Sequence, residues 1–401
     1  MATRVAVFLL CCPSTIDCGS LPDSGRAFGG RAWQRLGRDE SFRRFATDEK
    51  KEGGHPIAKA ITLKDVAREA GVHISTASRA LNEETRSELS VETADRVIAA
   101  AELLGYQPHP FARGLRTNRT RSVGMVVPDL VSPFIPPILA GAQHSLSKVG
   151  YSLLIGSDNE GSQRTKTAVE TFLDRRVDGL IVADARLDFT PPEQVLRHEV
   201  PTVLVGRSME NESLPAIVGD DRAALALVVR HLVELGHTHI AHIAGPLDIS
   251  TGLFRRDGFI DAIEGAGLAA SDCGIFEAGS FRLGDGHAAC DRLLDSDGVI
   301  TAIVAANDLL ALGCIDAIRE RGLNIPGDLS VTGYDDIALV DRLDPALTTI
   351  SLPYEAMGGA AGRLLLDLLA EHDRTVETSY EPMRLTPSLV VRSSTGPVGS
   401  R

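Results

Sequence analysis

After Arg121 the sequence alternates short apolar runs with longer amphipathic stretches, and this rhythm constrains the fold more than any other feature. Such runs are typical of parallel strands that helices cover on both faces. Repeated β-α-β units over about 270 residues predict an α/β protein with two doubly wound subdomains and a ligand site in the cleft between them. The expected strands are Val123–Val127, Tyr151–Ile155, Gly179–Val182, Thr202–Val205, His239–Ala244, Ala302–Ala305 and Leu329–Thr332.

The charge is distributed unevenly, which limits where a polyanion could bind. Residues 122–401 hold 22 basic and 39 acidic side chains, whereas residues 61–121 hold 9 basic and 8 acidic ones. An acidic body repels DNA, so any nucleic-acid contact must lie near the stretch 105–121, which contains four arginines and no acid.

Composition argues against several other classes of protein. No apolar run approaches the ~20 residues that cross a bilayer, and Val5–Cys12 is short for a secretory signal, so we expect a soluble, cytoplasmic, nucleoid-associated protein. The six cysteines show no metal-ligand spacing, and the last three, Cys273, Cys290 and Cys314, predict buried free thiols. Residues 1–60 lack periodicity and are expected to be a disordered extension or the product of a misassigned start codon; a lipoprotein-like signal at Leu10–Cys12 is a third reading.

Residues 61–107 predict a compact domain of three short helices. Thr62 is a good N-cap for the first helix, which Gly71 ends. A second helix is expected at Ile74–Asn82 and a third from Ser90 to Gly105. This pattern is typical of a helix-turn-helix, although a generic three-helix bundle with a polar outer face fits the same spacing.

The second of these helices separates into two faces. Ala77 and Leu81 can pack on the first helix, while the opposite face carries groups that could enter a major groove. Arg79 can bind a guanine through two hydrogen bonds, and Ser78 and Asn82 suit phosphate oxygens.

Thr62–Val72 (TLKDVAREAGV) and Ser75–Asn82 (STASRALN) resemble the N-terminal signature of the LacI/GalR family of bacterial transcriptional regulators. The resemblance continues through Gly105–Pro108 to about residue 395. It implies a non-enzymatic, homodimeric repressor of carbohydrate-utilisation genes that needs no cofactor. Its affinity for a double-stranded, pseudo-palindromic operator would be controlled by a sugar bound between the subdomains. A dimer is favoured over a tetramer, because the sequence after Ser394 is too short for a coiled coil.

The resemblance also assigns DNA contacts. It places Ile74 and Ser75 at variable base-reading positions and Arg79 at a common one. Residues 108–121 would form a hinge helix that folds only on operator DNA, with Leu115 as the minor-groove wedge; a flexible basic linker is the alternative. The full expected set is Thr62, Ile74, Ser75, Thr76, Ser78, Arg79, Asn82, Ala112, Arg113, Leu115 and Arg116.

Two departures from the family pattern concern the second helix. His73 stands where the family usually has a capping serine, and imidazole is a poorer cap, so the start of this helix is expected to be weakened. Ala77 replaces the usual valine and predicts a thinner contact with the first helix. Neither change removes a group that faces the groove.

Polar and aromatic residues, the kinds that a sugar site requires, follow several predicted strands. Sugars are bound by planar polar groups around their hydroxyls and by an aromatic face under the ring. The resemblance makes Arg255 and Asp335 the hydroxyl-binding pair and Asn307 a further partner. The expected effector-binding residues are Ser132, Phe134, Arg255, Phe281, Asn307 and Asp335.

Alternatives remain open at this site. Asp308 and Asp336 fit helix caps, and Arg255 could instead pair with Asp257 or Asp261 on a surface. Ser132 stands where the family usually has asparagine, and Pro136–Pro137 is unusual at the start of a helix, so the identity of the effector stays open.

Other functions have less support in the sequence. The cluster His237, His239 and His242 could suggest a metal, but a strand would direct the last two to opposite faces, so no metal is expected. No Walker loop or catalytic signature is present. A repressor with a purine or a protein as corepressor remains an alternative, and a sugar-binding protein of transport is a weaker one, because it would not need residues 62–121.

These observations divide the chain into segments. Residues 61–107 form the helix-turn-helix domain, 108–121 the hinge and 122–395 the effector-binding and dimerisation domain. Within the last, the N-subdomain is expected at 122–219 and 352–381 and the C-subdomain at 220–351 and 382–395. Residues 396–401 would form a tail.

Overall fold

The computed structural model describes residues 61–106, 119–157, 162–197, 199–370 and 380–399. The chain divides into two compact units. We call the described helical segment 61–106 the reading unit, and the described residues from 119 onward the core unit. The expectations for residues 1–60 and for most of the hinge lie outside the described residues.

The reading unit consists of short helices, as the sequence predicts. Thr62 starts the first through a capping box in which its backbone N–H and its hydroxyl donate to Asp65, at 3.0 and 2.6 Å. Gly71 and Gly105 have φ of +64°, the left-handed conformation that commonly follows a helix end. The sequence did not predict the helix at Glu83–Arg86, which is a single turn without an apolar repeat. The helices are α3 (Leu63–Glu69), α4 (Ile74–Ala80), α5 (Glu83–Arg86) and α6 (Val91–Leu104).

Small residues form the core of this unit. Each of three helices contributes a fully buried residue to one cluster: α3 contributes Val66, α4 contributes Ala77 and α6 contributes Val97. The His73 imidazole caps α4 by accepting a hydrogen bond from the Ser75 backbone N–H at 3.3 Å. This distance is longer than is usual for such a bond, in keeping with the expected weak cap.

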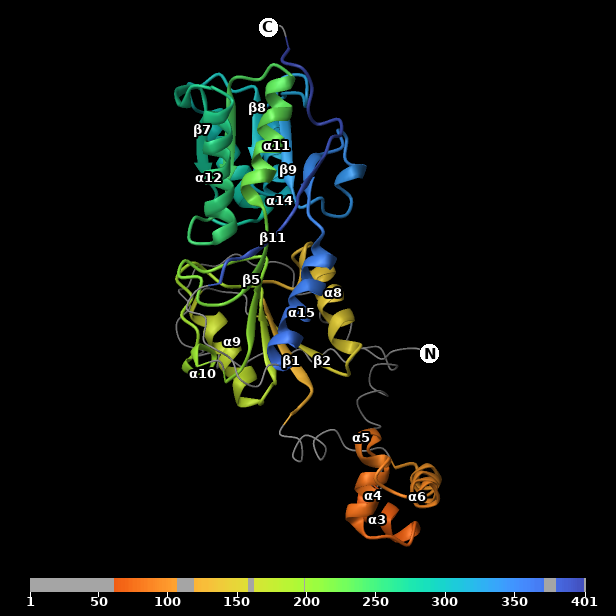
Figure 1. Cartoon of the computed structure of the whole chain (residues 1–401). Helices are drawn as coiled ribbons and strands as arrows, with labels where there is room; N and C mark the ends of the chain where they lie inside the picture. Colours follow the sequence, from red (N-terminus) through yellow and green to blue (C-terminus); the bar gives the residue numbers. More distant parts are fainter. Residues whose placement is uncertain (1–60, 107–118, 158–161, 198, 371–379, 400–401) are drawn as a thin grey trace, which may run out of the picture. The chain divides into compact units, whose positions relative to one another are not determined.

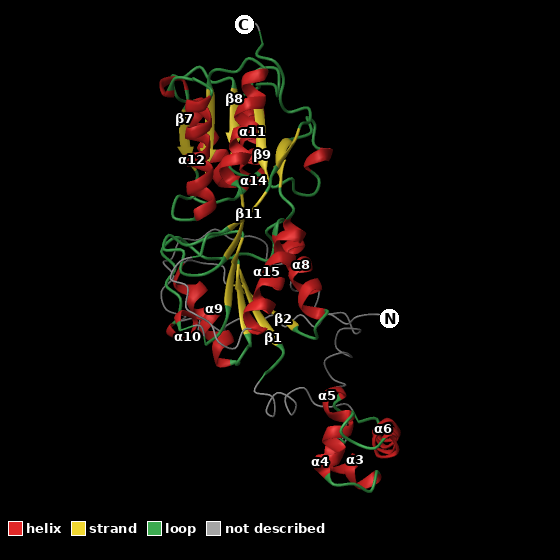
Figure 2. Cartoon of the chain, viewed as in Figure 1, coloured by secondary structure: helices red, strands yellow, loops and turns green. Residues whose placement is uncertain are grey.

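The core unit contains two six-stranded sheets, one in each lobe (Figures 1 and 2). The N-lobe sheet has the order β11-β5-β4-β3-β1-β2, and its strands pair in parallel, with Val123 opposite Leu153 between β1 and β2. Its strands are β1 (Ser122–Val127), β2 (Ser152–Ser157), β3 (Gly179–Val182), β4 (Thr202–Val205), β5 (Ala216–Gly219) and β11 (Met383–Leu385).

Helices cover both faces of the N-lobe sheet. Within β3, Ile181 packs with α8 (Ile135–Ser147) and α15 (Tyr354–Ala370), whereas Leu180 and Val182 pack with α9 (Ser162–Asp174) and α10 (Glu193–Leu196). Successive side chains of a strand point to opposite faces, so a sheet covered twice requires the continuous apolar runs seen in the sequence.

The C-lobe sheet has the order β12-β10-β9-β8-β6-β7, in which only the β10–β12 pair is antiparallel. Its strands are β6 (Ile240–Ala244), β7 (Gly274–Glu277), β8 (Ala302–Ala305), β9 (Ser330–Tyr334), β10 (Thr348–Ser351) and β12 (Ser388–Val390). Its helices are α11 (Asp221–Glu234) and α12 (Ser250–Gly265) on one face, α13 (Leu283–Leu294) and α14 (Asp308–Glu320) on the other, and the short η2 (Ala270–Asp272) and η3 (Val340–Arg342).

The chain passes between the lobes three times, after β5, after β10 and between β11 and β12. The last passage corrects the predicted boundary at 381/382, because Met383–Leu385 extends the N-lobe sheet by pairing with β5. The predicted tail also needs correction up to residue 399. The Gly396 carbonyl accepts a hydrogen bond from His237 at 3.0 Å, and the Val398 N–H donates to the Leu235 carbonyl at 3.2 Å.

Candidate DNA-reading surface and effector cavity

The outer face of α4 carries most of the predicted base-reading residues. Ile74, Ser75 and Arg79 are exposed, and Thr76 and Ser78 are half-buried. The other side of the helix holds Ala77 and Ala80, which are fully buried in the reading-unit core. Thr62, at the start of α3, is also exposed. The helix therefore presents polar side chains outward while small residues fix it to its neighbours, as a recognition helix requires.

Asn82 departs from the prediction that it faces outward. It is only 8% exposed, because the chain turns there into α5, whose last two residues, Thr85 and Arg86, donate their backbone N–H groups to the Asn82 carbonyl. The expected position on the outer face is therefore wrong, while a phosphate contact stays untested. The expected contacts of the hinge lie outside the described residues; they are Ala112, Arg113, Leu115 and Arg116.

Between the two lobes of the core unit, a small cavity of about 40 Å³ lies against a buried guanidinium. Arg255, on α12, is 6% exposed. Its Nε donates to Asp221 Oδ1 at 3.0 Å and its Nη1 donates to the Ala306 carbonyl at 2.6 Å. Its Nη2 lies 3.7 Å from Asp335 Oδ1, an ion-pair distance too long for a hydrogen bond.

Two buried tyrosines hold the residues of this polar wall, and Tyr354 also lines the cavity. The Tyr334 ring lies under the guanidinium of Arg255, with its centroid 3.6 Å from the Arg255 Cζ atom. The Tyr334 hydroxyl donates to Asp221 Oδ1 at 2.8 Å. The Tyr354 hydroxyl, at the start of α15, donates to Asp335 Oδ1 at 2.6 Å. This last bond joins an N-lobe helix to a C-lobe strand end across the cavity.

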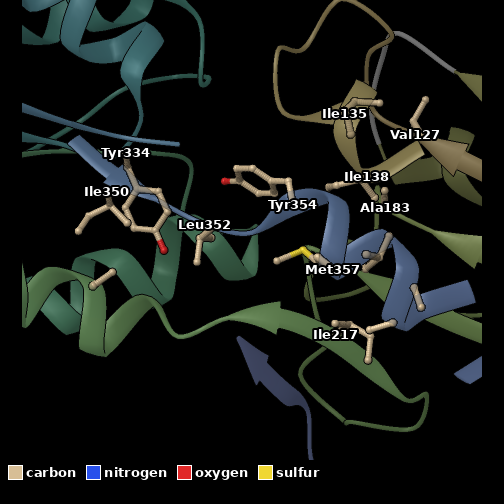
Figure 3. Packing of buried hydrophobic residues seen from close by; sticks show 14 of the residues in the cluster. Val127, Ile135, Ile138, Ala183, Ile217, Tyr334, Ile350, Leu352, Tyr354 and Met357 are labelled. Atoms are coloured by element: carbon tan, nitrogen blue, oxygen red, sulfur yellow. The ribbon is translucent and has the colours of Figure 1, made fainter. Parts of the chain in front are cut away.

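The opposite wall of the cavity is apolar and comes from the N-lobe. Phe134 lies before α8, with its ring centroid 5.8 Å from that of Tyr354. Ile138, Leu352 and Met357 continue the wall, and Figure 3 shows them grouped around the start of α15. A molecule held here would meet charged groups on one side and hydrocarbon on the other.

The predicted effector residues divide between two cavities. Phe134, Arg255, Phe281, Asn307 and Asp335 line the small inner cavity. Ser132 instead lines a larger, more open cleft of about 780 Å³, which Phe281 also borders. The structure therefore brings five of the six predicted residues together and leaves Ser132 outside that group.

Asn307, and not Asp308, is the helix cap that the sequence suggested, although Asn307 also lines the inner cavity. Asn307 is the N-cap of α14, with its Oδ1 accepting from the Leu310 N–H at 2.8 Å, while its Nδ2 donates to the Phe281 carbonyl at 3.2 Å. Asp308 is buried in the first turn and accepts from the Thr349 hydroxyl and the Ile337 N–H at 2.5 and 2.8 Å.

The surface pairings considered for Arg255 are wrong. Arg256, not Arg255, binds Asp257, and Arg222 binds Asp261. Asp336 forms an ion pair with Arg392, with Nη2 of the arginine 2.7 Å from Oδ1 of the carboxylate.

The sequence missed several residues of the inner cavity. Asp221 and Tyr354 line it, Tyr334 holds Arg255 and Asp221 without lining it, and none of the three was predicted as a ligand residue. Arg207 was missed too; it borders both cavities and binds Asp184 at 2.5 Å. The position of Tyr334 directly before Asp335, at a strand end, is the one signal that could have identified a member of this set.

Burial and neighbouring charges shift the ionisation of this cluster. Burial raises the pKa of Asp335 to about 6, although Arg255 and the Tyr354 hydroxyl oppose the rise. Burial, together with the negative charge of Asp335, raises the pKa of Asp308 to about 8. Burial disfavours the charged guanidinium, but Asp221, Tyr334 and Asp335 outweigh it and raise the pKa of Arg255.

We expect the free energy of unfolding to fall by roughly 1–2 kcal/mol between pH 6.5 and 8. The folded state keeps the Asp308 proton to about pH 8, whereas the unfolded chain releases it near 3.8, so this stabilisation is lost as the pH rises through the folded value. The pKa of His242, lowered by burial to about 4, makes an opposite contribution that is complete above pH 6.5.

Chemical denaturation at several pH values checks this expectation. Asp308→Asn imitates the neutral acid and should remove most of the slope, while Asp316→Asn, at an exposed position of the same helix, should keep it. An unchanged slope in Asp308→Asn would contradict the assignment.

Among the described residues, no group of three or more potential ligand side chains is arranged to hold a metal ion. His237 forms hydrogen bonds with the Thr301 hydroxyl and the Gly396 carbonyl. His242 is buried and stacks on the ring of Phe259, with the two ring centroids 5.0 Å apart. In the same part of the chain, no helix is long and apolar enough to cross a bilayer.

Comparison with known proteins identifies both units. A family model described as bacterial regulatory proteins, lacI family, matches residues 62–109, and one described as a periplasmic binding protein-like domain matches residues 229–395. The transcriptional repressor CytR of Escherichia coli (strain K12) is 34% identical over 308 residues, covering 77% of this chain and 89% of CytR. The chain belongs to the lacI family.

Further relatives of this lacI-family chain agree with both the fold and the function. The repressor PurR of Haemophilus influenzae (strain PittEE) is 33% identical and covers 83% of this chain and 98% of PurR. The lac repressor dimer bound to operator and the anti-inducer ONPF matches with a TM-score of 0.72 and 29% identity over 84% of this chain and all of that one. The predicted family, fold and regulatory function are confirmed: the chain is a DNA-binding transcriptional repressor with a small-molecule effector.

Proposed function

We propose that this repressor binds a pseudo-palindromic operator as a homodimer in the cytoplasm. A sugar bound between its lobes, against the inner cavity and in the larger cleft that shares Arg207 and Phe281 with it, controls operator affinity. The function is one of binding, with α4 reading the DNA. Relatives support the proposal: one solved structure is a complex of the regulator CelR with cellobiose, at 29% identity and a TM-score of 0.62, over 83% of this chain and 99% of that one.

The observation that carries the proposal is the polar wall around Arg255. Its Nη2 and Asp335 Oδ1 are 3.7 Å apart and both residues line the cavity, so a donor and an acceptor are available to the same ligand hydroxyl. Neighbouring hydroxyls of a sugar suit this arrangement, because each can accept from a guanidinium and donate to a carboxylate.

A planar heterocycle such as a purine is the second candidate for the effector. The rings of Phe134 and Tyr354, with Met357 beside them, offer apolar aromatic surface on the N-lobe side. Aromatic rings stack well on such a surface, and a heterocycle could still accept from Arg255 through a ring nitrogen or a carbonyl oxygen.

A thermal-shift screen of sugars, sugar phosphates and purines should identify the effector. A ligand at about 100 times its dissociation constant adds about 2.7 kcal/mol to the free energy of unfolding, which is readily measured. The shift should disappear in Arg255→Ala and persist in Arg256→Ala, whose side chain binds only its neighbour Asp257 among the described contacts. No hit across the panel, with folded protein, would contradict a small-molecule effector of these classes.

A further inference from the structure

The core unit begins with a short segment that is tied down at unusually many points. Residues 119–122 are where the chain coming from the reading unit enters the N-lobe. The carboxylate of Asp178, at the start of β3, accepts hydrogen bonds from the backbone N–H groups of Thr120 and Arg121, at 2.7 and 2.9 Å. One side chain therefore fixes two successive peptide groups.

Further contacts hold the same segment. The Thr120 hydroxyl lies 3.0 Å from Asp178 Oδ1 and 3.0 Å from the Arg176 carbonyl. The Asp178 N–H donates to the Ser122 carbonyl at 2.8 Å, so the carboxylate is itself held in register with β1. Arg121 has φ of +49°, a left-handed conformation that a residue with a side chain adopts only when its surroundings impose it.

The segment is also bound to a helix that reaches the effector cavity. Arg119 Nη2 donates to the Leu369 carbonyl in the last turn of α15, at 3.1 Å. The other end of α15 carries Tyr354 and Met357, which line the inner cavity. A helix of 17 residues is about 25 Å long, so α15 spans the distance between the cavity and the segment.

The helix α15 is packed closely against its neighbour α8. A Cβ atom added to Gly141 would lie 1.9 Å from the Glu355 carbonyl oxygen, and one added to Gly358 would lie 1.9 Å from that of Ile138. The two helix backbones are thus in direct contact, and such tightly packed pairs shift as rigid bodies rather than bending.

We propose that Asp178 and Arg119 are positioning residues for operator binding. Asp178 fixes the direction in which the chain leaves the N-lobe toward the reading unit, and Arg119 joins this exit to the end of α15. The proposal rests on the proposed operator function. In a dimer with two fixed exits, the separation of the two reading units would match one half-site spacing, and loosening the exits would relax that match.

The first test measures binding to DNA selected by the wild-type protein from duplexes with a randomised centre. Asp178→Asn places amide hydrogens where the carboxylate now accepts, and should weaken binding to the selected duplex about tenfold. Thr120→Val keeps its backbone bond and should cost about two- to threefold. Neither variant should change affinity for a scrambled duplex. As a control, Asp174→Asn, at an exposed position on α9, should leave binding to both duplexes unchanged.

A readout of geometry separates positioning from mere stability. Inserting one base pair at the centre of the selected duplex should weaken wild-type binding strongly and Asp178→Asn binding much less. If the wild type selects no sequence, the operator function itself fails and the proposal with it. If Asp178→Asn binds the selected duplex as tightly as the wild type, or loses both duplexes equally, the proposal fails alone.

A double-mutant cycle tests the connection through α15 without any effector. Tyr354→Phe removes the hydroxyl that binds Asp335 across the cavity, and should change affinity for the selected duplex. In combination with Arg119→Ala its effect should be at least threefold smaller, although sites ~20 Å apart normally act additively. As a control, the effects of Tyr354→Phe and Arg175→Ala on affinity should add, because Arg175 is an exposed residue close to Asp178 in the sequence. No effect of Tyr354→Phe, or additivity with Arg119→Ala, would overturn this connection.

Discussion

Arg255→Ala is expected to leave the repressor on its operator at effector concentrations that release the wild type. The substitution removes the cation that faces Asp221 and Asp335 and leaves the Ala306 carbonyl without its donor at 2.6 Å. Breaking such a buried pair by removing one partner costs roughly 3–5 kcal/mol. At neutral pH the free energy of unfolding of the core should therefore drop by about this amount, and effector binding should be lost.

The pH dependence of Arg255→Ala distinguishes this cause from general damage. Without the cation, the pKa of Asp335, already raised by burial to about 6, should rise further. The folded variant then binds protons more tightly than the unfolded chain, so it should regain stability as the pH falls from 7 to 5. Denaturation curves at both pH values measure this recovery.

The neighbouring arginine supplies a matched control. Arg256 is half-buried and binds Asp257 at the surface of the same helix, so Arg256→Ala should respond to the effector as the wild type does. Gel retardation with increasing effector gives the comparison. Release of Arg255→Ala at the wild-type effector concentration would contradict the role of this residue.

Much of the core architecture could be predicted from the sequence because both sheets are covered twice. Gly179–Val182 and Thr202–Val205 are buried throughout, and apolar runs of this kind are visible in the sequence. β7 was not predicted, because it alternates half-buried and exposed residues at a sheet edge. β11 and β12 were missed because three-residue strands carry too little pattern, and the buried four-residue strands β5 and β10 were missed as well.

The effector cavity was predictable where a residue follows a strand or matches the family pattern, and not where its role depends on a distant partner. Arg255, Asn307 and Asp335 were predicted by resemblance and line the cavity. Asp221 lies in the first turn of α11, and only the packing of α11 against α12 brings its carboxylate 3.0 Å from Arg255. Tyr354 reaches Asp335 only because the chain crosses between the lobes directly before α15.

The two walls of the cavity explain how a small molecule could control DNA binding. The polar wall belongs mainly to the C-lobe and the apolar wall to the N-lobe, so a ligand gains its full contacts only at one separation of the lobes. Such a ligand binds two lobe arrangements with different affinities, and a difference of ~1–3 kcal/mol is typical of allosteric coupling. Arrangement-dependent affinity is also the condition for any shift of population.

The last expected result concerns the reading unit. Arg79→Ala should weaken binding to the selected operator by about 1–3 kcal/mol per half-site, because it removes the guanidinium that we expect to donate to both acceptors of a guanine. Arg79 is exposed on α4, whose opposite side is anchored by Ala77 and Ala80, so the stability of the unit should change by less than about 0.5 kcal/mol.

Arg79→Lys separates recognition of a base from attraction to phosphate. Lysine keeps the charge but not the planar pair of donors, so it should retain affinity for scrambled DNA and the salt dependence of binding while losing preference for the selected sequence. If lysine restored the full preference, Arg79 would be acting on the DNA backbone. Because Arg79 lies in the reading unit and the cavity in the core unit, both variants should bind the effector with wild-type affinity; a parallel loss of operator and effector binding would indicate misfolding and contradict this assignment.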